Sequence, residues 1–376
     1  MHTLQAIGLT KHFPVRTRLA AGRVATRVRA LDGVTVQVTE RETLGIVGES
    51  GSGKTTLAKL FLLLERPTAG SVLFDGKDLQ TLGHDDLARY RRNVQAVFQD
   101  PYSSLNPRMR VEQIVGEPLI PGNGVARHMV RQRVAEVLEL VGLRADSLAL
   151  YPHEFSGGQR QRIAIARALV TFPKFIILDE PVSALDVSIR AQILNLLKRL
   201  QDQLGLAYIM ISHDLAAARY LATRLAVMYA GKLVETGDCE AVYRAPLHPY
   251  TEALLSAALP LHPSARRPRI VLAGEVPNPT NPPAGCRFHP RCPHVMRECP
   301  IEEPGWREVT ADHFTACHLH KEAVLASRAG PGAAPSGGQC PASRDLRFQM
   351  HGEARNSGSC PAARRLTLAM RISNQV

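Results

Sequence analysis

The chain has 376 residues, of which 45% are hydrophobic, 21% charged and 5% aromatic. This composition suits a globular protein with a mostly aliphatic core and more than one domain. No apolar run approaches the roughly 20 residues that span a bilayer, and the N-terminus lacks a basic-then-apolar secretion signal. We therefore expect a cytoplasmic protein that serves a membrane only through partners.

The formal net charge is +12, which could suit nucleic acid, anionic lipid or phosphate ligands. Residues 321–376 contribute +5 of it, from eight Lys or Arg against three Asp or Glu. The remaining +7 is spread over a large body, and no aromatic residues interleave with the basic ones as single-strand binders need. Nucleic acid is therefore a disfavoured partner, and we expect residues 321–376 to be a disordered basic tail.

Several short apolar runs predict buried strands. Residues 43–47 stop at a glycine, and residues 55–64 then place leucines and a phenylalanine at helical spacing. Residues 175–178, 207–211 and 225–229 are near-continuous apolar runs, which strands covered on both faces require. Strand, glycine loop and helix in this order predict an α/β fold with a parallel sheet.

The middle and the end of the chain differ from this pattern. Between Gln99 and Ser156 strand signals are few and residues 126–141 are helical, so we expect a helical insertion at about 100–160 within a sheet domain of residues 1–244. Proline becomes dense after Tyr243, which excludes long helices. We expect a small Cys- and Pro-rich C-terminal extension over residues 245–320.

Residues 48–55, Gly-Glu-Ser-Gly-Ser-Gly-Lys-Thr, fit the phosphate-loop pattern G-x-x-x-x-G-K-[ST] in full. Glycines let backbone N–H groups close on phosphate oxygens, and the following helix points its positive end at the same anion. A chance glycine-rich turn would lack the strand before it and the helix after it. The pattern predicts MgATP bound by Gly48, Ser50, Gly51, Gly53, Lys54, Thr55 and Thr56, with Lys54 on the β- and γ-phosphates and the Thr55 hydroxyl on Mg²⁺.

Two carboxylates end the strand predicted at 175–178. Asp179 and Glu180 would face the ligand crevice of an open α/β sheet, where Asp179 would hold Mg²⁺ and Glu180 would act as general base on the attacking water. The alternative is a pair of solvated surface acids. His213 follows another predicted strand and would reach the same edge, although a lone histidine there is more often structural.

A second anion cradle is predicted at Ser156-Gly157-Gly158-Gln159, because a serine and two glycines precede a strong helix at residues 160–170. A single site cannot easily use both this cradle and the phosphate loop. The economical solution is a head-to-tail dimer, in which each ATP contacts the phosphate loop of one chain and the serine–glycine cradle of the other.

In combination these motifs resemble the ATP-binding subunits of ABC transporters over about residues 1–320. The resemblance implies an ATPase with the fold of a P-loop NTPase. It makes residues 48–56 the Walker A loop, Asp179 with Glu180 the Walker B pair, and residues 156–159 the signature motif. It further implies that Gln99 is the Q-loop glutamine, which contacts Mg²⁺ and faces the membrane subunits. Residues 183–186, with Asp186, are similar to the D-loop. His213 is similar to the switch histidine, and Phe13 to the aromatic residue that stacks on adenine.

The subfamily resemblance is to the peptide and nickel importers. It rests on residues 97–107, 151–155, 246–251 and 285–293, and Tyr102-Ser103 is similar to the second of the two ATPase subunits of such importers. It implies a heterodimer with a related ATPase subunit, two membrane permease subunits, an extracytoplasmic solute-binding protein and a place on the cytoplasmic face of the membrane. The cargo would be dipeptides, oligopeptides or nickel. The rival reading is a soluble ABC ATPase that acts on nucleic acid or the ribosome.

Four cysteines cluster late in the chain with the spacing C-x5-C-x6-C-x17-C. The C-x2-C knuckles of common zinc ribbons are missing, but four thiolates can hold a [4Fe–4S] cluster or a zinc ion. The alternatives are unligated thiols or a disulfide pair, and a nearby histidine could replace one thiolate. We hypothesise a structural iron–sulfur cluster, or zinc, at Cys286, Cys292, Cys299 and Cys317.

Overall fold

An eight-stranded sheet forms the centre of the protein in the computed structural model, which describes residues 2–19, 22–100, 104–119, 127–257 and 268–321. The strand order is β11-β12-β10-β9-β3-β8-β7-β6, and the pairs among β9, β3, β8, β7 and β6 are parallel. The strands are β3 (Thr43–Val47), β6 (Val94–Val97), β7 (Phe175–Asp179), β8 (Ala207–Ser212), β9 (Arg224–Tyr229), β10 (Lys232–Asp238), β11 (Arg307–Thr310) and β12 (His313–Thr315).

The four apolar runs identified in the sequence are the central strands of this sheet. Strands β3, β7 and β8 are buried at every position, as expected for strands covered on both faces. Helix α1 (Lys54–Phe61) follows β3 directly and buries Leu57, Leu60 and Phe61. The predicted order of strand, glycine loop and helix is therefore confirmed.

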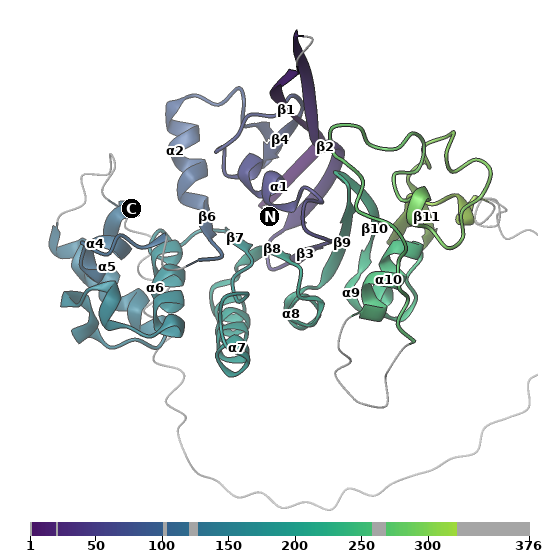
Figure 1. The fold of residues 1–376 in the computed structure, drawn as a ribbon. Coiled ribbons are helices and arrows are strands. Elements are labelled where there is room, and N and C mark those ends of the chain that lie inside the picture. The colour runs from purple at the N-terminus through teal and green to yellow at the C-terminus, as the bar shows by residue number, and fades with distance from the viewer. Residues whose placement is uncertain (1, 20–21, 101–103, 120–126, 258–267, 322–376) are drawn as a thin grey trace, which may run out of the picture. The chain divides into compact units, whose positions relative to one another are not determined.

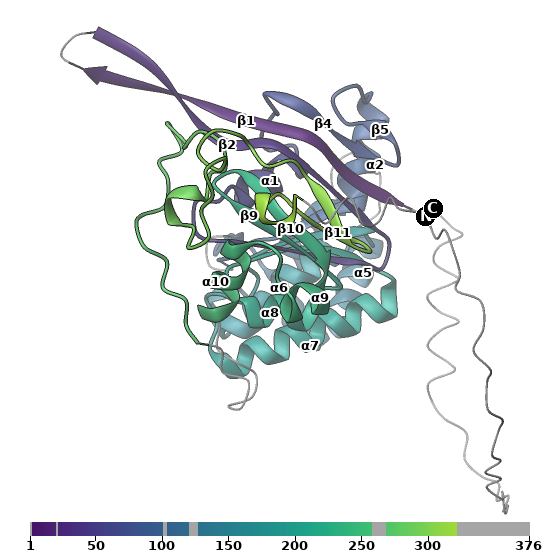
Figure 2. The same ribbon diagram turned by 90° about the vertical axis from the view of Figure 1, so that its right-hand side faces the viewer.

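A second, antiparallel sheet covers α1 from the other side. Its order is β2-β1-β4-β5, with β1 (Thr3–Leu19), β2 (Gly22–Thr39), β4 (Ala69–Phe74) and β5 (Lys77–Asp78). Strands β1 and β2 form a long hairpin whose arm extends well past the rest of the sheet (Figure 2). The sequence analysis identified no strand in this segment, although Val34, Val36 and Val38 of β2 alternate with polar residues and are buried.

The remaining helices lie on the other face of the large sheet or at its ends (Figure 1). Helices α4, α5 and α6 form a group beside β6 with their own apolar core, which includes Val134, Val137 and Ile163. This group contains the helices predicted at 126–141 and 160–170. The helices are α2 (His84–Asn93), α4 (Val111–Gly116), η1 (Glu117–Leu119), α5 (Arg127–Leu140), η2 (Ala145–Ala149), η3 (Pro152–Glu154), α6 (Gly157–Leu169), α7 (Val187–Leu204), α8 (Leu215–Leu221), α9 (Cys239–Arg244), α10 (Pro249–Ala257), η5 (His289–Arg291) and η6 (His318–His320).

The proline-rich C-terminal segment packs directly onto the sheet at β9 and β10. Strand β12 pairs with β10, so this segment extends the large sheet by two strands. Tyr250 and Phe288 are buried against Tyr229 in a shared apolar cluster. The predicted basic tail, residues 321–376, lies beyond the described residues except for Lys321.

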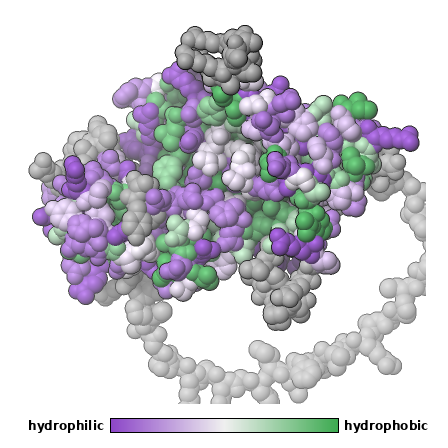
Figure 3. Space-filling view, viewed as in Figure 1, coloured by the Kyte–Doolittle hydropathy of each residue, from purple (hydrophilic) through white to green (hydrophobic). Residues whose placement is uncertain are grey.

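Apolar side chains are exposed on the C-terminal segment, where Val271 and Ile301 are about 80% accessible. In the space-filling view, hydrophobic colour gathers more over this segment than over α4–α6, whose surface is mainly hydrophilic (Figure 3). In the part of the chain that the structure describes, no helix combines the length and apolar character needed to cross a membrane.

A fully buried carboxylate joins the C-terminal segment to the sheet. Glu235 in β10 is 0% exposed and accepts hydrogen bonds from the backbone N–H groups of Leu247 and His248, both at 2.9 Å. His313 in β12 places its Nε2 2.7 Å from the same carboxylate. A buried carboxylate is tolerated only when its oxygens are fully paired, so this network fixes the junction at 245–249 against two strands.

We expect Glu235→Gln to lower the free energy of unfolding by about 2 kcal/mol, because the amide turns an N–H₂ group toward donors that have no other acceptor. Urea unfolding followed by circular dichroism measures this. The exposed Glu275→Gln in the same segment is the control and should unfold like the wild type. Equal midpoints for the two variants would contradict the role given to Glu235.

Candidate nucleotide site

The predicted phosphate loop connects β3 to α1, and two of its glycines are required by close contacts. A Cβ atom at Gly48 would lie 2.2 Å from the Met228 carbonyl oxygen, and one at Gly53 would lie 2.4 Å from that of Ala30. Both glycines have positive φ angles, 154° and 104°. Ser50, Gly51 and Thr55 are exposed around the loop, and Thr56 is half-buried. The backbone of the loop is therefore accessible from solvent, as it must be for its N–H groups to bind phosphate.

Lys54 is the buried cation of this loop, only 6% exposed. Its ammonium donates to the carbonyl oxygens of Gly48 and Glu49, at 2.7 and 2.8 Å, and to Ser52 Oγ at 3.2 Å. Burial lowers the pKa of Lys54, and the carboxylates of Glu180, Asp179 and Glu49 oppose that shift. The lysine thus lies among acceptors that phosphate oxygens can replace.

The two predicted carboxylates meet this lysine at the carboxyl edge of the sheet. Asp179 is the last residue of β7 and is 9% exposed; burial, and then the neighbouring Glu180, raise its pKa. Glu180 follows with a φ of 50°, a conformation that non-glycine residues adopt rarely and mostly at functional sites. Its Oε1 lies 2.8 Å from His213 Nδ1. The structure therefore brings together Lys54, Asp179, Glu180 and His213, as the sequence predicted.

Two predicted contact residues approach from other elements. Gln99 is exposed just after β6, at the same edge as Asp179 because β6 and β7 are parallel. Phe13 pairs with Val28 in the hairpin, and Lys11 Nζ lies 4.8 Å from the centre of its ring. Tyr102 and Ser103, which carry the resemblance to one of two ATPase subunits, lie outside the described residues.

The serine–glycine cradle forms the exposed start of α6. Ser156 and Gln159 make a reciprocal capping box, in which Ser156 N–H donates to Gln159 Oε1 at 2.9 Å. A Cβ atom at Gly158 would lie 2.6 Å from Ile189 Cγ2 of α7, and the nearest atom to Gly157 would be 3.8 Å away. Asp186 is exposed at the N-cap of α7. The cradle therefore lies at the surface, with Ser156 and Gln159 exposed and the two glycines half-buried.

These residues fit MgATP. The loop offers a glycine cradle that side chains would block, a buried ammonium and the N-terminus of α1, which together bind phosphate groups. Oxygen ligands suit Mg²⁺, and this edge offers the Asp179 carboxylate, the Thr55 hydroxyl and the Gln99 amide oxygen, besides the carboxylate of Glu180.

The sequence reading missed a contact between the loop and the C-terminal segment. Arg291 in η5 makes two hydrogen bonds to the Glu49 carboxylate, Nη1–Oε2 at 2.8 Å and Nη2–Oε1 at 3.1 Å. Tyr250 in α10 accepts a hydrogen bond from the Glu49 backbone N–H at 2.8 Å. Both residues lie in stretches that resemble the peptide and nickel importers, and nothing in their spacing points to Glu49.

The four late cysteines are free thiols that lie in one neighbourhood. Cys286 N–H donates to the Cys299 carbonyl at 2.8 Å. Burial above all, and then the other three cysteines, raise the pKa of Cys317 to about 12. Within the described ranges, however, no three His, Cys, Asp or Glu side chains are arranged to hold a metal ion.

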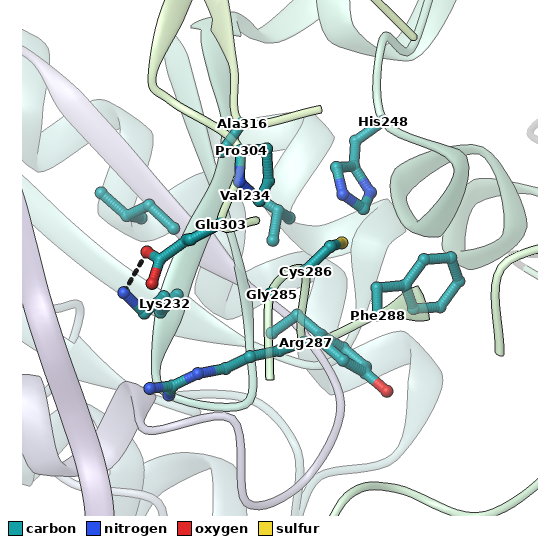
Figure 4. Close-up of a pocket in the computed structure, with 12 residues that line it drawn as sticks. Lys232, Val234, His248, Gly285, Cys286, Arg287, Phe288, Glu303, Pro304 and Ala316 are labelled. Carbon is teal, nitrogen blue, oxygen red and sulfur yellow. Dashed lines mark hydrogen bonds and ion pairs between the residues drawn. The ribbon is translucent and has the colours of Figure 1, made fainter. Parts of the chain in front are cut away.

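A cavity of about 40 Å³ lies beside Cys286, between the C-terminal segment and β9–β10. His248 and Phe288 line one side, and the ion pair of Lys232 with Glu303 lies on the other (Figure 4). Cys286 is the one residue of the four cysteines that lines it. The cavity is therefore not a common centre for the thiols.

Known proteins match nearly all of the described chain. Residues 31–183 match the ABC transporter family, and residues 234–299 match the oligopeptide/dipeptide transporter C-terminal region. The putative oligopeptide transport ATP-binding protein YkfD of Bacillus subtilis is 50% identical over 306 residues, covering 81% of this chain and 93% of the relative. The dipeptide transport ATP-binding protein DppF of Haemophilus influenzae is 48% identical over 314 residues, covering 84% and 95%.

Solved structures share the fold. One is cbiO1 from Clostridium perfringens, part of the ABC transporter complex cbiONQ, with a TM-score of 0.54 at 29% identity over 64% of this chain and 90% of that one. Another is the ATP-binding cassette MJ0796 in a dimeric post-hydrolysis state with ADP and Pi, with a TM-score of 0.53 at 30% identity over 63% and 98%. The P-loop NTPase type of α/β fold is confirmed, and the chain belongs to the ABC transporter family as an ATP-hydrolysing subunit.

Proposed function

We propose that this chain energises the import of dipeptides or oligopeptides. The observation that carries the proposal is the match of residues 234–299 to the oligopeptide/dipeptide transporter C-terminal region, on a chain that also holds a complete phosphate loop. Relatives named as oligopeptide and dipeptide transport ATP-binding proteins are 48–50% identical to it. Nickel is the alternative cargo suggested by the sequence.

The partners follow from this function. A related ATPase subunit would complete a heterodimer, two membrane permease subunits would form the path, and an extracytoplasmic solute-binding protein would deliver the cargo. The chain would act at the cytoplasmic face of the membrane. We assign ATP hydrolysis to residues 1–244, the contact with the permeases to the helical part at about 100–160, and a supporting role to residues 245–320.

Within the ATPase, each predicted residue has a role that its position supports. Lys54 exchanges its carbonyl acceptors for the β- and γ-phosphates, and Asp179, Thr55 and Gln99 would hold Mg²⁺, which neutralises phosphate charge. Glu180 accepts the proton of the attacking water. His213 is hydrogen-bonded to Glu180 and orients that carboxylate toward the γ-phosphate. Phe13 would stack on adenine.

The exposed cradle supports a nucleotide-sandwiching dimer. Ser156, Gly157, Gly158 and Gln159 would contact the ATP held by the partner, and Asp186 would lie at the same interface. The neighbouring fold MJ0796 is dimeric in the presence of ADP and Pi. Closure of the two ATPase subunits would move the helical part against the permeases and produce alternating access.

The experiment that tests the function is uptake by the reconstituted complex. The chain, co-purified with its membrane partners in mild detergent, is placed in proteoliposomes with ATP at its own face, and the solute-binding protein with a labelled dipeptide at the other. ATP-dependent dipeptide uptake that excess nickel does not inhibit supports the proposal. Nickel uptake without peptide uptake favours the alternative cargo, and co-purification with ribosomes instead of membrane proteins would overturn transport altogether.

We expect Glu180→Gln to bind ATP and to dimerise but to lose at least about 100-fold in turnover, because the amide cannot take the proton of the attacking water. Phosphate release and size-exclusion chromatography with ATP measure the two properties. The exposed Glu252→Gln in α10 is a control of the same chemical change and should hydrolyse ATP normally. Near-normal turnover by Glu180→Gln would refute the assignment of the base.

We also propose that Cys286, Cys292, Cys299 and Cys317 hold a structural [4Fe–4S] cluster, with zinc as the alternative. The support is the donor set: four free thiols in one neighbourhood, three of them near enough to the fourth, Cys317, to raise its pKa. Ligation requires the thiolate forms, and burial disfavours the thiolates of Cys286, Cys292 and Cys317 by raising the pKa of each, so metal binding would release protons and fix the segment.

Anaerobically purified protein is therefore expected to carry stoichiometric iron and sulfide, or zinc, and Cys299→Ala should lose it. Metal analysis and visible absorption measure the content. Cys239→Ala is the control, because that thiol is buried in α9 and belongs to the ATPase domain. Colourless protein with four titratable free thiols and no metal would reject the cluster.

A further inference from the structure

Glu49, the first variable residue of the phosphate loop, is held at three points. Its carboxylate receives two hydrogen bonds from Arg291, its backbone N–H donates to Tyr250, and its carbonyl accepts from Lys54. Two of these three partners belong to the C-terminal segment. The loop that binds phosphate is therefore fixed in part from outside the ATPase domain.

The Arg291 contact is strong for an ion pair. The arginine side chain is only 8% exposed, and its two parallel hydrogen bonds match the fork geometry in which guanidinium binds carboxylate best. Its Nη1 also lies 3.3 Å from the Tyr229 hydroxyl. Since the guanidinium has few other ways to turn, it restrains where the Glu49 side chain can lie.

Tyr250 restrains the backbone of the same residue. The tyrosine is fully buried, and its ring packs against Tyr229 at 4.6 Å and Phe288 at 5.5 Å between ring centroids. A hydroxyl on such an immobile ring gives the Glu49 N–H a fixed acceptor. Arg291 and Tyr250 thus hold both the side chain and the backbone of one loop residue.

Nucleotide binding removes the third restraint. To reach phosphate oxygens, Lys54 must leave the carbonyl oxygens of Gly48 and Glu49. These two carbonyls then lose the hydrogen bonds that Lys54 donates to them. With Glu49 still fixed by Arg291 and Tyr250, the loop keeps its shape during this exchange. A preorganised loop binds more tightly because less ordering is required on binding.

We propose that Arg291 is a positioning residue for ATP: with Tyr250, it holds Glu49 so that the phosphate loop keeps its binding conformation before the nucleotide arrives. The inference rests on the nucleotide site assigned above, but it does not depend on the cargo. It gives the C-terminal segment a direct part in ATP affinity.

Docking of the segment does not depend on Arg291 alone. Arg287 binds the Asp32 carboxylate and the Ala230 carbonyl oxygen, and Glu235 fixes the junction near residue 248. Removing the Arg291 side chain should therefore release Glu49 while the segment stays in place. This separation makes the role of Arg291 testable.

The test is equilibrium titration of the full chain with a fluorescent ATP analogue and Mg²⁺. Arg291→Ala and Glu49→Gln should each weaken binding roughly tenfold, and the double variant should bind like either single variant, because both act through one ion pair. Arg291→Lys should recover part of the loss. Arg297→Ala, an exposed arginine of the same segment, should bind like the wild type.

Hydrolysis by the same variants separates positioning from chemistry. The KM for ATP should rise about tenfold while kcat changes less than twofold, since the loop regains its shape once ATP is bound. Wild-type affinity in Arg291→Ala, or losses that add in the double variant, would overturn the proposal. If Arg291→Ala also lowers the melting temperature of the nucleotide-free chain, Glu49→Gln decides, because it leaves the segment intact: tenfold weaker binding supports the proposal and unchanged binding rejects it.

The outcome is independent of transport. A chain that shows the non-additive loss of ATP affinity but supports no peptide uptake keeps the role of Arg291 and loses the proposed cargo. A chain that imports peptides but binds ATP equally with and without Arg291 keeps the proposed function and loses this inference.

Discussion

The buried ammonium of Lys54 is the constraint on which the site depends. A lysine with 6% exposure is stable in its charged form only if acceptors surround it, and in this structure those acceptors are two loop carbonyls, a serine hydroxyl and the nearby carboxylates. Phosphate oxygens can take the place of the carbonyls without loss of pairing. The carboxylates that remain, Asp179 and Glu180, are the groups that the proposed mechanism then assigns to Mg²⁺ and water.

Much of this arrangement could be predicted because it is local or periodic. At residues 48 and 53 a Cβ atom would lie less than 3 Å from neighbouring atoms, so only glycine fits there. The glycines of the sequence pattern therefore follow directly from the shape of the loop. Buried strands appear in the sequence as apolar runs. The parallel pairing of β7 with β8 then brings Asp179 and His213 to one edge of the sheet. The β1–β2 hairpin was not predicted, because the alternation of Val34, Val36 and Val38 with polar residues covers only a short part of two long strands.

The contacts of the C-terminal segment could not be predicted either, for a different reason. Arg291 and Glu49 are 242 residues apart, and an arginine in a proline-rich stretch carries no periodic signal that names its partner. The cysteines illustrate the same limit: their spacing suggests the types of ligand a metal would find, but it does not say how the four thiols are arranged around one point. Sequence spacing gives ligand types, whereas the distance between their atoms depends on packing around Phe288 and Tyr250.

The C-terminal segment packs so closely against the sheet and the phosphate loop that it forms one structural unit with the ATPase domain. It adds strands to the catalytic sheet, covers Tyr229 at the end of β9, and reaches Glu49 with two side chains. Strand β9 also carries Met228, whose carbonyl oxygen excludes any side chain at Gly48. If Arg291 positions the loop as proposed, a displacement of this segment would shift the phosphate loop through both β9 and Arg291, and a partner bound to the segment would alter ATP affinity by the same two routes.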